Sequence, residues 1–362
     1  MKVLNLSLDN SVLSKDSGLA KRITEYGNLV EKYIVIVPAK HNKKTELSNR
    51  AMAYGVKSGN KILGLLRIYG LAKKILREEK FDVISAQDQY FLGLAAWVLA
   101  RKFKIGLEIQ VHGFEKFGGA REIIARFVIP RANSLRCVSR RLKRKLVGEF
   151  GAAEGIITVA PIYADFGLKI KDLRVGRDDG RFIFLTVGRL APVKNIGAQI
   201  RAFKNLEPKI KNLELWIVGD GPERGNLSSV IGDLELEDKI KLFGWRDDLE
   251  KFYGQADAFL LTSDSEGWGL AVIEAASRAL PIIMTDVGCA GEVIRDGESG
   301  IVIPVGDQKK LEEAMIGLAE DGSLRKRLGE NAREAVKKLP SKEEILRLYK
   351  QSWEKAVKNK EL

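Results

Sequence analysis

With 362 residues, 45% of them hydrophobic, the sequence has enough apolar material for two buried cores. Its longest apolar run, residues 91–100, is about half of what spans a bilayer as a helix, and its two cysteines and two histidines exclude a disulfide framework and a structural zinc motif. The formal net charge of +13 lies in the N-terminal half, because residues 1–180 contain 33 lysines and arginines against 18 aspartates and glutamates.

The chain alternates short β-rich runs with longer helical patterns, which is typical of parallel sheets covered by helices. Twelve strands are predicted, at residues 3–8, 33–37, 81–85, 105–111, 134–138, 156–160, 182–187, 214–218, 240–243, 258–261, 282–284 and 301–303. The polar stretch 163–181 between the two series of strands indicates a domain boundary. We therefore predict an α/β protein with two Rossmann-like domains that face a central cleft. Residues 1–165, with 341–362 packing back as a last helix, form the first domain, and residues 166–340 form the second.

In the first domain, two positions at strand ends are candidate site residues. Gly18 lies at the start of a helix, where a side chain would obstruct a ligand that approaches the backbone, although ordinary turn chemistry also explains a glycine there. His112 follows a strand and precedes a glycine, which suits a cleft as well as it suits a hydrogen-bonded core histidine. Both alternatives stay open for both residues.

A dense basic segment, residues 131–146, interleaves arginines and lysines with leucines. It suits a solvated helix face, a surface for anionic lipid headgroups or an acidic acceptor, or a nucleic-acid surface. Because the segment contains no aromatic residue that could stack on bases, we expect no nucleic-acid partner. Residues 1–10 lack the apolar core of an export signal, so we expect a cytoplasmic protein that can associate peripherally with the inner face of the membrane.

In the second domain, two cations lie at the predicted edge of the sheet. Arg189 follows the strand at 182–187 and Lys194 precedes a helix, so both suit a diphosphate, with ordinary solvent-facing loop charges as the alternative. The glycines of residues 217–225 are spaced G-x-G-x-x-x-G after a strand that is not the first of its domain. That spacing and position argue against a dinucleotide-binding motif.

The stretch 263–274, SDSEGWGLAVIE, follows a strand and begins a helix at Leu270. Gly267 and Gly269 allow a tight turn, and a helix that starts at a glycine-rich strand exit directs its free N–H groups and positive dipole end toward a phosphate. Glu266 in the loop and Glu274 on the helix are expected to reach one cleft. The acidic residues at 264–266 also resemble a metal site, but they open a glycine turn, and we predict no metal.

Five segments, in this order, resemble the C-terminal domain of glycosyltransferase family 4, the group 1 glycosyltransferases: residues 187–195, 217–222, 242–245, 263–275 and 291–307. The N-terminal half resembles the family in its opening loop, in the VHG at 111–113 and in its strand pattern. The resemblance implies the GT-B fold, an N-terminal acceptor-binding domain and a C-terminal donor-binding domain. The chain departs from the family pattern at Ser17, where many relatives have a first glycine before Gly18, and at Trp268, where Phe is common.

The resemblance also implies a set of site residues. The implied catalytic residues are Glu266, His112, Arg189 and Lys194. The implied donor-binding residues are Gly18, Gly244, Trp245, Glu266, Gly267, Trp268, Gly269, Leu270 and Glu274. In this assignment the two cations bind the diphosphate, Glu274 binds the ribose hydroxyls, and Gly244 and Trp245 lie near the base. His112 contacts the donor sugar.

Such enzymes are retaining, metal-independent hexosyltransferases, so we expect a UDP- or GDP-sugar as donor and no required cofactor. The basic N-terminal half favours an anionic acceptor, such as a glycan or lipid-linked intermediate of cell-envelope glycan biosynthesis, and contact with an anionic membrane surface. Three alternatives remain open: a sugar-nucleotide epimerase of GT-B architecture, a phosphorylase, and a non-catalytic basic protein that binds membranes or polyanions.

Overall fold

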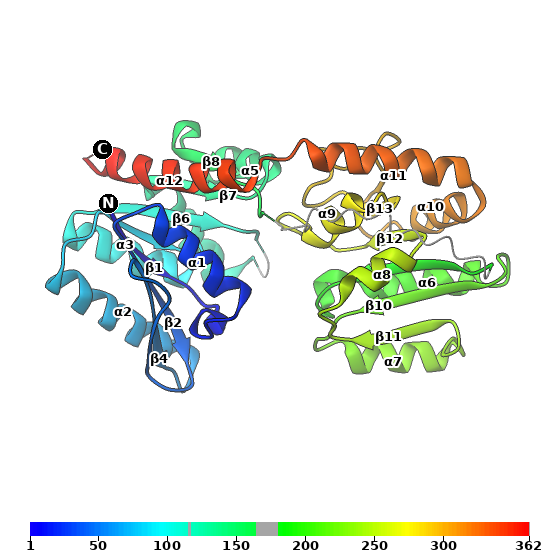
Figure 1. The fold of residues 1–362 in the computed structure, drawn as a ribbon, viewed down its shortest axis with the longest axis horizontal. Coiled ribbons are helices and arrows are strands. Elements are labelled where there is room, and N and C mark those ends of the chain that lie inside the picture. The colour runs from blue at the N-terminus through cyan, green and yellow to red at the C-terminus, as the bar shows by residue number, and fades with distance from the viewer. Residues whose placement is uncertain (115–116, 164–179, 362) are drawn as a thin grey trace. The chain divides into compact units, whose positions relative to one another are not determined.

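The computed structural model describes residues 1–114, 117–163 and 180–361 (Figure 1). The chain divides into two compact units. Unit 1 comprises Met1–Pro161 and Pro340–Leu362, and unit 2 comprises Ile162–Leu339. The predicted boundary between residues 165 and 166 lies outside the described residues. Each unit is a helix-covered sheet of mainly parallel strands, which confirms the prediction of two Rossmann-like α/β domains.

In the described part of unit 1, eight strands form one sheet in the order β3-β4-β2-β1-β5-β6-β7-β8, parallel except for the β3–β4 pair. The strands are β1 (Lys2–Leu6), β2 (Lys32–Ala39), β3 (Lys43–Glu46), β4 (Ala51–Lys57), β5 (Val83–Ala86), β6 (Gly106–Val111), β7 (Ser134–Cys137) and β8 (Ile157–Val159). The helices are α1 (Gly18–Asn28), α2 (Lys61–Glu78), α3 (Phe91–Phe103), α4 (Gly119–Val128), α5 (Arg140–Phe150) and α12 (Lys342–Lys358). The central strands β5, β6 and β7 are buried along their whole length, as expected for a sheet covered on both faces.

Unit 2, over its described residues, has a six-stranded parallel sheet in the order β11-β10-β9-β12-β13-β14. The strands are β9 (Phe182–Val187), β10 (Leu213–Val218), β11 (Ile240–Gly244), β12 (Ala258–Leu261), β13 (Ile282–Thr285) and β14 (Ile301–Ile303). The helices are α6 (Ile196–Leu206), α7 (Arg224–Asp233), α8 (Leu249–Gln255), α9 (Leu270–Ser277), α10 (Gln308–Glu320) and α11 (Gly322–Lys337). When the strands are numbered within the unit, with β9 as the first, their order in the sheet is 3-2-1-4-5-6, which is that of a Rossmann fold. The order reverses between β9 and β12, so ligands are expected at the carboxyl ends of these two neighbouring strands.

All twelve predicted strands are present, but the prediction omits β3 and β4. The short β3 pairs antiparallel with β4 at the edge of the sheet, and three of its four residues are exposed. A polar edge strand lacks the apolar alternation by which strands are predicted. The first strand is also shorter than expected, because it ends at Leu6 and Leu8 is 61% exposed. None of the described helices is both long and apolar enough to cross a membrane.

The last helix, α12, packs on β6 and β7 of unit 1 over a buried ion pair (Figure 1). Arg136 of β7 donates from Nε to Glu108 Oε1 of β6 at 3.0 Å, and both side chains are almost fully buried. Trp353 of α12 donates its Nε1–H to Glu108 Oε2 at 3.1 Å, and the Tyr349 ring lies 3.5 Å from the Arg136 guanidinium carbon. A capping box formed by Ser341 with the third residue of the helix starts α12 just after Pro340.

The charges of this ion pair stabilise each other. Burial alone would raise the pKa of Glu108, but the charge of Arg136 and hydrogen bonds from that arginine and two serines outweigh burial and lower the pKa. Arg136 belongs to the basic segment 131–146, yet its side chain is only 4% exposed. It therefore contributes to the core of unit 1 and not to a basic surface.

We expect the variant Glu108→Ala to lower the free energy of unfolding by about 3–5 kcal/mol, because it leaves the buried Arg136 without its counter-charge. The matched control is Glu122→Ala, which removes a partly exposed partner of Arg126 on α4 and should change the free energy by about 0.5 kcal/mol or less. Urea denaturation followed by circular dichroism measures both. Equal effects of the two substitutions would contradict this role of the buried pair.

Candidate functional site

The loops after β9 and β12 are joined by the hydroxyl of Thr262, the residue that follows β12. Gln199 of α6 donates from Nε2 to Thr262 Oγ1 at 2.9 Å. The same oxygen lies 3.1 Å from the carbonyl oxygen of Lys194 and 3.0 Å from that of Asn195, so the hydroxyl donates to this part of the β9 loop. The loop that carries the predicted phosphate ligands is thus held against the end of the neighbouring strand.

Lys194 and Glu266, which lie 72 positions apart in the sequence, form an ion pair at this edge of the sheet. Their side chains are 23% and 11% exposed. Glu266 Oε1 also accepts a hydrogen bond from Ser263 Oγ at 2.9 Å. Its other oxygen, Oε2, accepts no hydrogen bond from a described residue. The pair is therefore anchored through one carboxylate oxygen, and the second oxygen remains available.

Glu274 on α9 is held in the same manner. Its Oε2 accepts a hydrogen bond from the Tyr253 hydroxyl at 2.7 Å, and within the described part of the chain its Oε1 has no partner. Burial, and next the charge of Glu274, raise the pKa of Tyr253 well above its ordinary value, so the phenol stays protonated and donates. The Arg278 guanidinium lies over the Tyr253 ring, 4.9 Å from its centroid, at a cation–π distance.

The turn before α9 presents backbone rather than side chains. Gly269 has a φ of 91° and caps α9, which begins at Leu270 as predicted, whereas Gly267 does not have a positive φ. The Trp268 ring is 3% exposed, and the carbonyl oxygen of this residue accepts from the Cys289 N–H at 2.9 Å. The buried ring supports the turn, and the first N–H groups of α9 lie at the sheet edge where the β12 loop ends.

The loop after β10 contains the two glycines Gly219 and Gly221, and the structure gives a packing reason for both. A Cβ atom at Gly219 would lie 1.9 Å from the carbonyl oxygen of Gly188, and one at Gly221 would lie 2.3 Å from that of Leu190. Only glycine allows the loops after β9 and β10 to approach so closely. The G-x-G pattern is therefore explained by contact between two loops.

Three further residues lie at the carboxyl ends of β9 and β11. Arg189, just after β9, is exposed. Trp245, just after β11, is 72% exposed and donates its Nε1–H to Asp247 Oδ1 at 3.2 Å. Gly244 has a φ of 71°, and a Cβ atom there would lie 3.0 Å from Arg224 Nη1. The Arg224 guanidinium is therefore a third cation at this edge, in addition to Arg189 and Lys194.

The structure thus brings the predicted residues of unit 2 to the ends of parallel strands in a single sheet. Sequence reasoning missed the side chains that hold them, namely Ser263, Tyr253, Thr262 and Arg224. Tyr253 and Arg224 lie on helices, and no motif distinguishes them from packing or surface residues. The described residues contain no group of three or more His, Cys, Asp or Glu side chains placed to hold a metal ion.

Of the two predicted residues of unit 1, only His112 directly follows a strand. Gly18 is the first residue of α1, where Ser17 caps the helix by accepting from the Ala20 N–H at 3.0 Å, and a Cβ atom at Gly18 would meet nothing within 4 Å. His112 follows β6, and its imidazole is exposed and forms no hydrogen bond with a described residue. Partial desolvation by the surrounding protein, and then the positive charges of Arg136 and Arg22, lower the pKa of His112 below its ordinary value.

Two protein-family models match this chain. The family model described as glycosyl transferases group 1 matches residues 170–335, and the model described as glycosyltransferase family 4 matches residues 34–164. N-acetyl-alpha-D-glucosaminyl L-malate synthase of Bacillus anthracis is 30% identical over 174 residues, 48% of this chain and 45% of that protein. The lipopolysaccharide core biosynthesis glycosyltransferase LpsE of Rhizobium meliloti (strain 1021) is 30% identical over 169 residues, 47% of this chain and 48% of that protein. The chain thus spans about half the length of these relatives.

Solved structures show the same fold over almost the whole chain. Sucrose-phosphate synthase from Thermosynechococcus elongatus superposes with a TM-score of 0.82 at 18% identity and covers 97% of this chain and 98% of its own. Anabaena HepE in complex with UDP and glucose superposes with a TM-score of 0.77, also at 18% identity, with the same coverage of both chains. At this identity the likeness establishes the GT-B fold alone.

The lowered pKa of His112 can be measured directly, because the chain has only one other histidine, His41. We expect the His112 ring signal to titrate with a midpoint between about 4 and 6.5, since water screens part of the effect at an exposed ring and the imidazole is neutral at pH 7. Proton NMR over pH 3.5–8 gives the midpoint, and the variant His41→Gln assigns the two signals. A midpoint above 6.5 would contradict the expected sign.

Proposed function

We propose that the chain, whose two halves match the group 1 and family 4 glycosyltransferase models, transfers a sugar from a UDP-sugar to a glycan or lipid-linked acceptor of cell-envelope polysaccharide. Uridine is favoured as the base because the solved neighbour HepE was crystallised with UDP, and the acceptor class is suggested by the name of LpsE. The name of the relative from Bacillus anthracis, N-acetyl-alpha-D-glucosaminyl L-malate synthase, suggests a small hydroxy acid as the competing acceptor class.

The observation that carries this proposal is the shared arrangement of Glu266 and Glu274. Each carboxylate is fixed through one oxygen, by Lys194 and Ser263 in the first case and by Tyr253 in the second, and each keeps its other oxygen for a ligand. Two fixed acceptors suit the hydroxyl groups of a donor, with Glu274 Oε1 accepting from the ribose and Glu266 Oε2 from the transferred sugar.

The diphosphate of the donor would lie between these carboxylates. Lys194 has three N–H donors and uses one for Glu266, so it can also bind a phosphate oxygen. Arg189 after β9 adds a second cation, and the free N–H groups at the start of α9, after Gly269, point along the positive end of the helix dipole. Gly244 and Trp245, after β11, would then lie near the uracil.

In the proposed reaction, the bond between C1 of the sugar and the diphosphate oxygen breaks while the acceptor oxygen forms a bond to C1. Negative charge grows on the departing diphosphate, and the two cations and the α9 N–H groups stabilise that charge more in the transition state than in the bound donor. The acceptor oxygen attacks from the face that the diphosphate leaves, and the acceptor proton passes to the diphosphate. This course retains the configuration at C1 and uses no metal ion.

Gly18 and His112 of unit 1 are proposed to contact the donor phosphates and the donor sugar. A neutral imidazole can accept from or donate to a sugar hydroxyl. The acceptor is proposed to bind unit 1, with α5 facing an anionic acceptor or an anionic membrane surface. Arg140 and Arg144 on α5 support this proposal, because both are exposed and neither pairs with a described carboxylate.

Glu274→Gln should weaken UDP binding about 10- to 100-fold, because an amide oxygen accepts less strongly from the ribose than a carboxylate while the Tyr253 hydrogen bond survives. Isothermal titration calorimetry with UDP and GDP measures the affinity. The matched control Glu313→Gln removes an exposed carboxylate on α10 and should bind UDP as the unaltered chain does. A folded protein that binds neither nucleotide would refute the proposal and favour a non-catalytic binding protein.

With a suitable acceptor, the product should keep the anomeric configuration of the donor sugar. Proton NMR in the first turnovers gives the configuration from the coupling constant of the anomeric proton. The variant Lys194→Ala should slow the release of UDP at least about 100-fold, because it removes a cation that stabilises the departing diphosphate. An inverted product would contradict the proposed course at C1. Conversion of the UDP-sugar without any acceptor would instead indicate an epimerase.

A further inference from the structure

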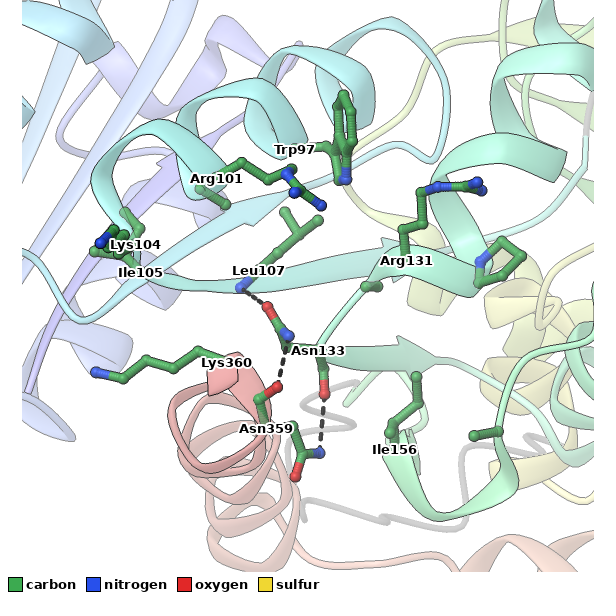
Figure 2. A pocket seen from close by; sticks show the side chains of 14 residues that line it. Trp97, Arg101, Lys104, Ile105, Leu107, Arg131, Asn133, Ile156, Asn359 and Lys360 are labelled. Atoms are coloured by element: carbon green, nitrogen blue, oxygen red, sulfur yellow. Dashed lines mark hydrogen bonds between the residues drawn. The ribbon is translucent and has the colours of Figure 1, made fainter. Parts of the chain in front are cut away.

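A second concave site lies in unit 1, at the amino ends of β6 and β7 (Figure 2). Its volume of about 970 Å³ is at the upper end of the range of about 300–1,000 Å³ that is typical of small-molecule sites. Leu107 near the start of β6 lines it, whereas His112 follows the other end of that strand. Five residues of strand separate them by about 17 Å, so the pocket is distinct from any site at the carboxyl ends of the sheet.

Four cations surround this pocket, and no acidic residue lines it. Arg101 and Lys104 come from the end of α3, Arg131 precedes β7, and Lys360 follows α12. All four side chains are exposed, and none of them forms an ion pair with a carboxylate of the described residues. Unneutralised cations that line one concave site attract an anion.

Packing and hydrogen bonds fix the walls of the pocket (Figure 2). The Arg131 guanidinium lies 4.1 Å from the Phe127 ring centroid and donates from Nη1 to the Phe127 carbonyl oxygen at 2.9 Å. Asn133 accepts from the Leu107 N–H at 2.9 Å and donates to the Asn359 carbonyl oxygen at 2.7 Å. Asn359 returns a hydrogen bond to the Asn133 carbonyl oxygen at 3.1 Å, so the segment with Lys360 is anchored in the wall.

The pocket also offers an apolar surface beside its charges. The Arg101 guanidinium lies 5.7 Å from the Trp97 ring, which is itself packed edge-on against Phe127 at 4.8 Å. An aromatic face next to guanidinium groups suits a ligand that joins a phosphate to a sugar ring or an acyl chain. Positive charge continues along α3 and onto α2, where Lys102 of α3 and next Arg77 of α2 lower the pKa of Lys73.

We propose that this pocket binds a phosphate-bearing ligand through Arg101, Lys104, Arg131 and Lys360, with the sugar ring or acyl portion of the ligand against Trp97. The phosphate comes either from a soluble sugar phosphate or from the headgroup of an anionic lipid. This proposal is independent of the nucleotide-binding residues that are proposed in unit 2, and of the sugar that is transferred.

Fluorine NMR of the protein labelled with 5-fluorotryptophan tests the proposal, because the five tryptophans sample separate places. Trp97 reports on the pocket, Trp245 and Trp268 report on the edge of the unit 2 sheet, and the buried Trp216 and Trp353 serve as references. Glucose 1-phosphate should shift the Trp97 signal, assigned with Trp97→Phe, in a saturable manner. Phosphatidylglycerol vesicles, compared with phosphatidylcholine vesicles, distinguish the lipid source.

The variant Arg101→Gln/Arg131→Gln should weaken the Trp97 response at least about 10-fold. If loss of the Arg131 contacts prevents folding, Arg101→Gln/Lys360→Gln tests the same charges. The matched control Lys40→Gln/Lys61→Gln removes two exposed cations elsewhere in unit 1 and should respond as the unaltered chain does. The proposal is overturned if Trp97 responds to neither phosphate source, if glucose alone shifts it equally, or if the pocket variants bind as tightly as the control.

Discussion

The candidate site in unit 2 depends on the hydroxyl of Thr262. In a parallel sheet, two neighbouring strands bring their carboxyl ends to the same edge, but the loops that leave them are free to diverge. Thr262 prevents this by bonding the carbonyl oxygens of Lys194 and Asn195, and the Asp264 N–H adds a 2.8 Å bond to the Val193 carbonyl oxygen. The ion pair between Lys194 and Glu266 follows from this junction. A lysine and a glutamate far apart in the sequence thereby become a prearranged pair at low additional entropic cost.

In unit 1, a buried ion pair fixes the position of the last helix, α12. Glu108 and Arg136 lie on neighbouring strands, and the returning helix α12 supplies Trp353 and Tyr349 to complete their surroundings. A fully apolar contact between α12 and the sheet would tolerate sliding, whereas an ion pair that must be satisfied from the helix has only one acceptable register. The close approach of Gly106 to the Ala356 backbone acts in the same direction, since a Cβ atom there would lie 2.4 Å from the carbonyl oxygen. The last helix therefore has one defined position on unit 1.

The sequence predicts the parts of this protein that repeat a pattern and misses the parts that depend on contact. Buried parallel strands are apolar runs, and all twelve predicted strands exist, whereas the polar edge strand β3 carries no such signal. The start of α9 at Leu270 follows from local glycine chemistry. The bond between Tyr253 and Glu274 joins separate helices, and the burial of Arg136 inside a basic segment reverses what its neighbours suggest. The pocket beside Trp97 is assembled from four separated segments without any motif.

The glycines of the candidate site differ in whether the fold itself requires them. Gly219 and Gly221 are fully explained by the loops they touch, so their presence says nothing about a nucleotide. Gly18 is different, because a Cβ atom there would meet no protein atom within 4 Å and α1 would gain helix propensity from an alanine. The fold does not require a glycine at this position. Contacts within the described residues therefore do not explain Gly18, in contrast to Gly219 and Gly221.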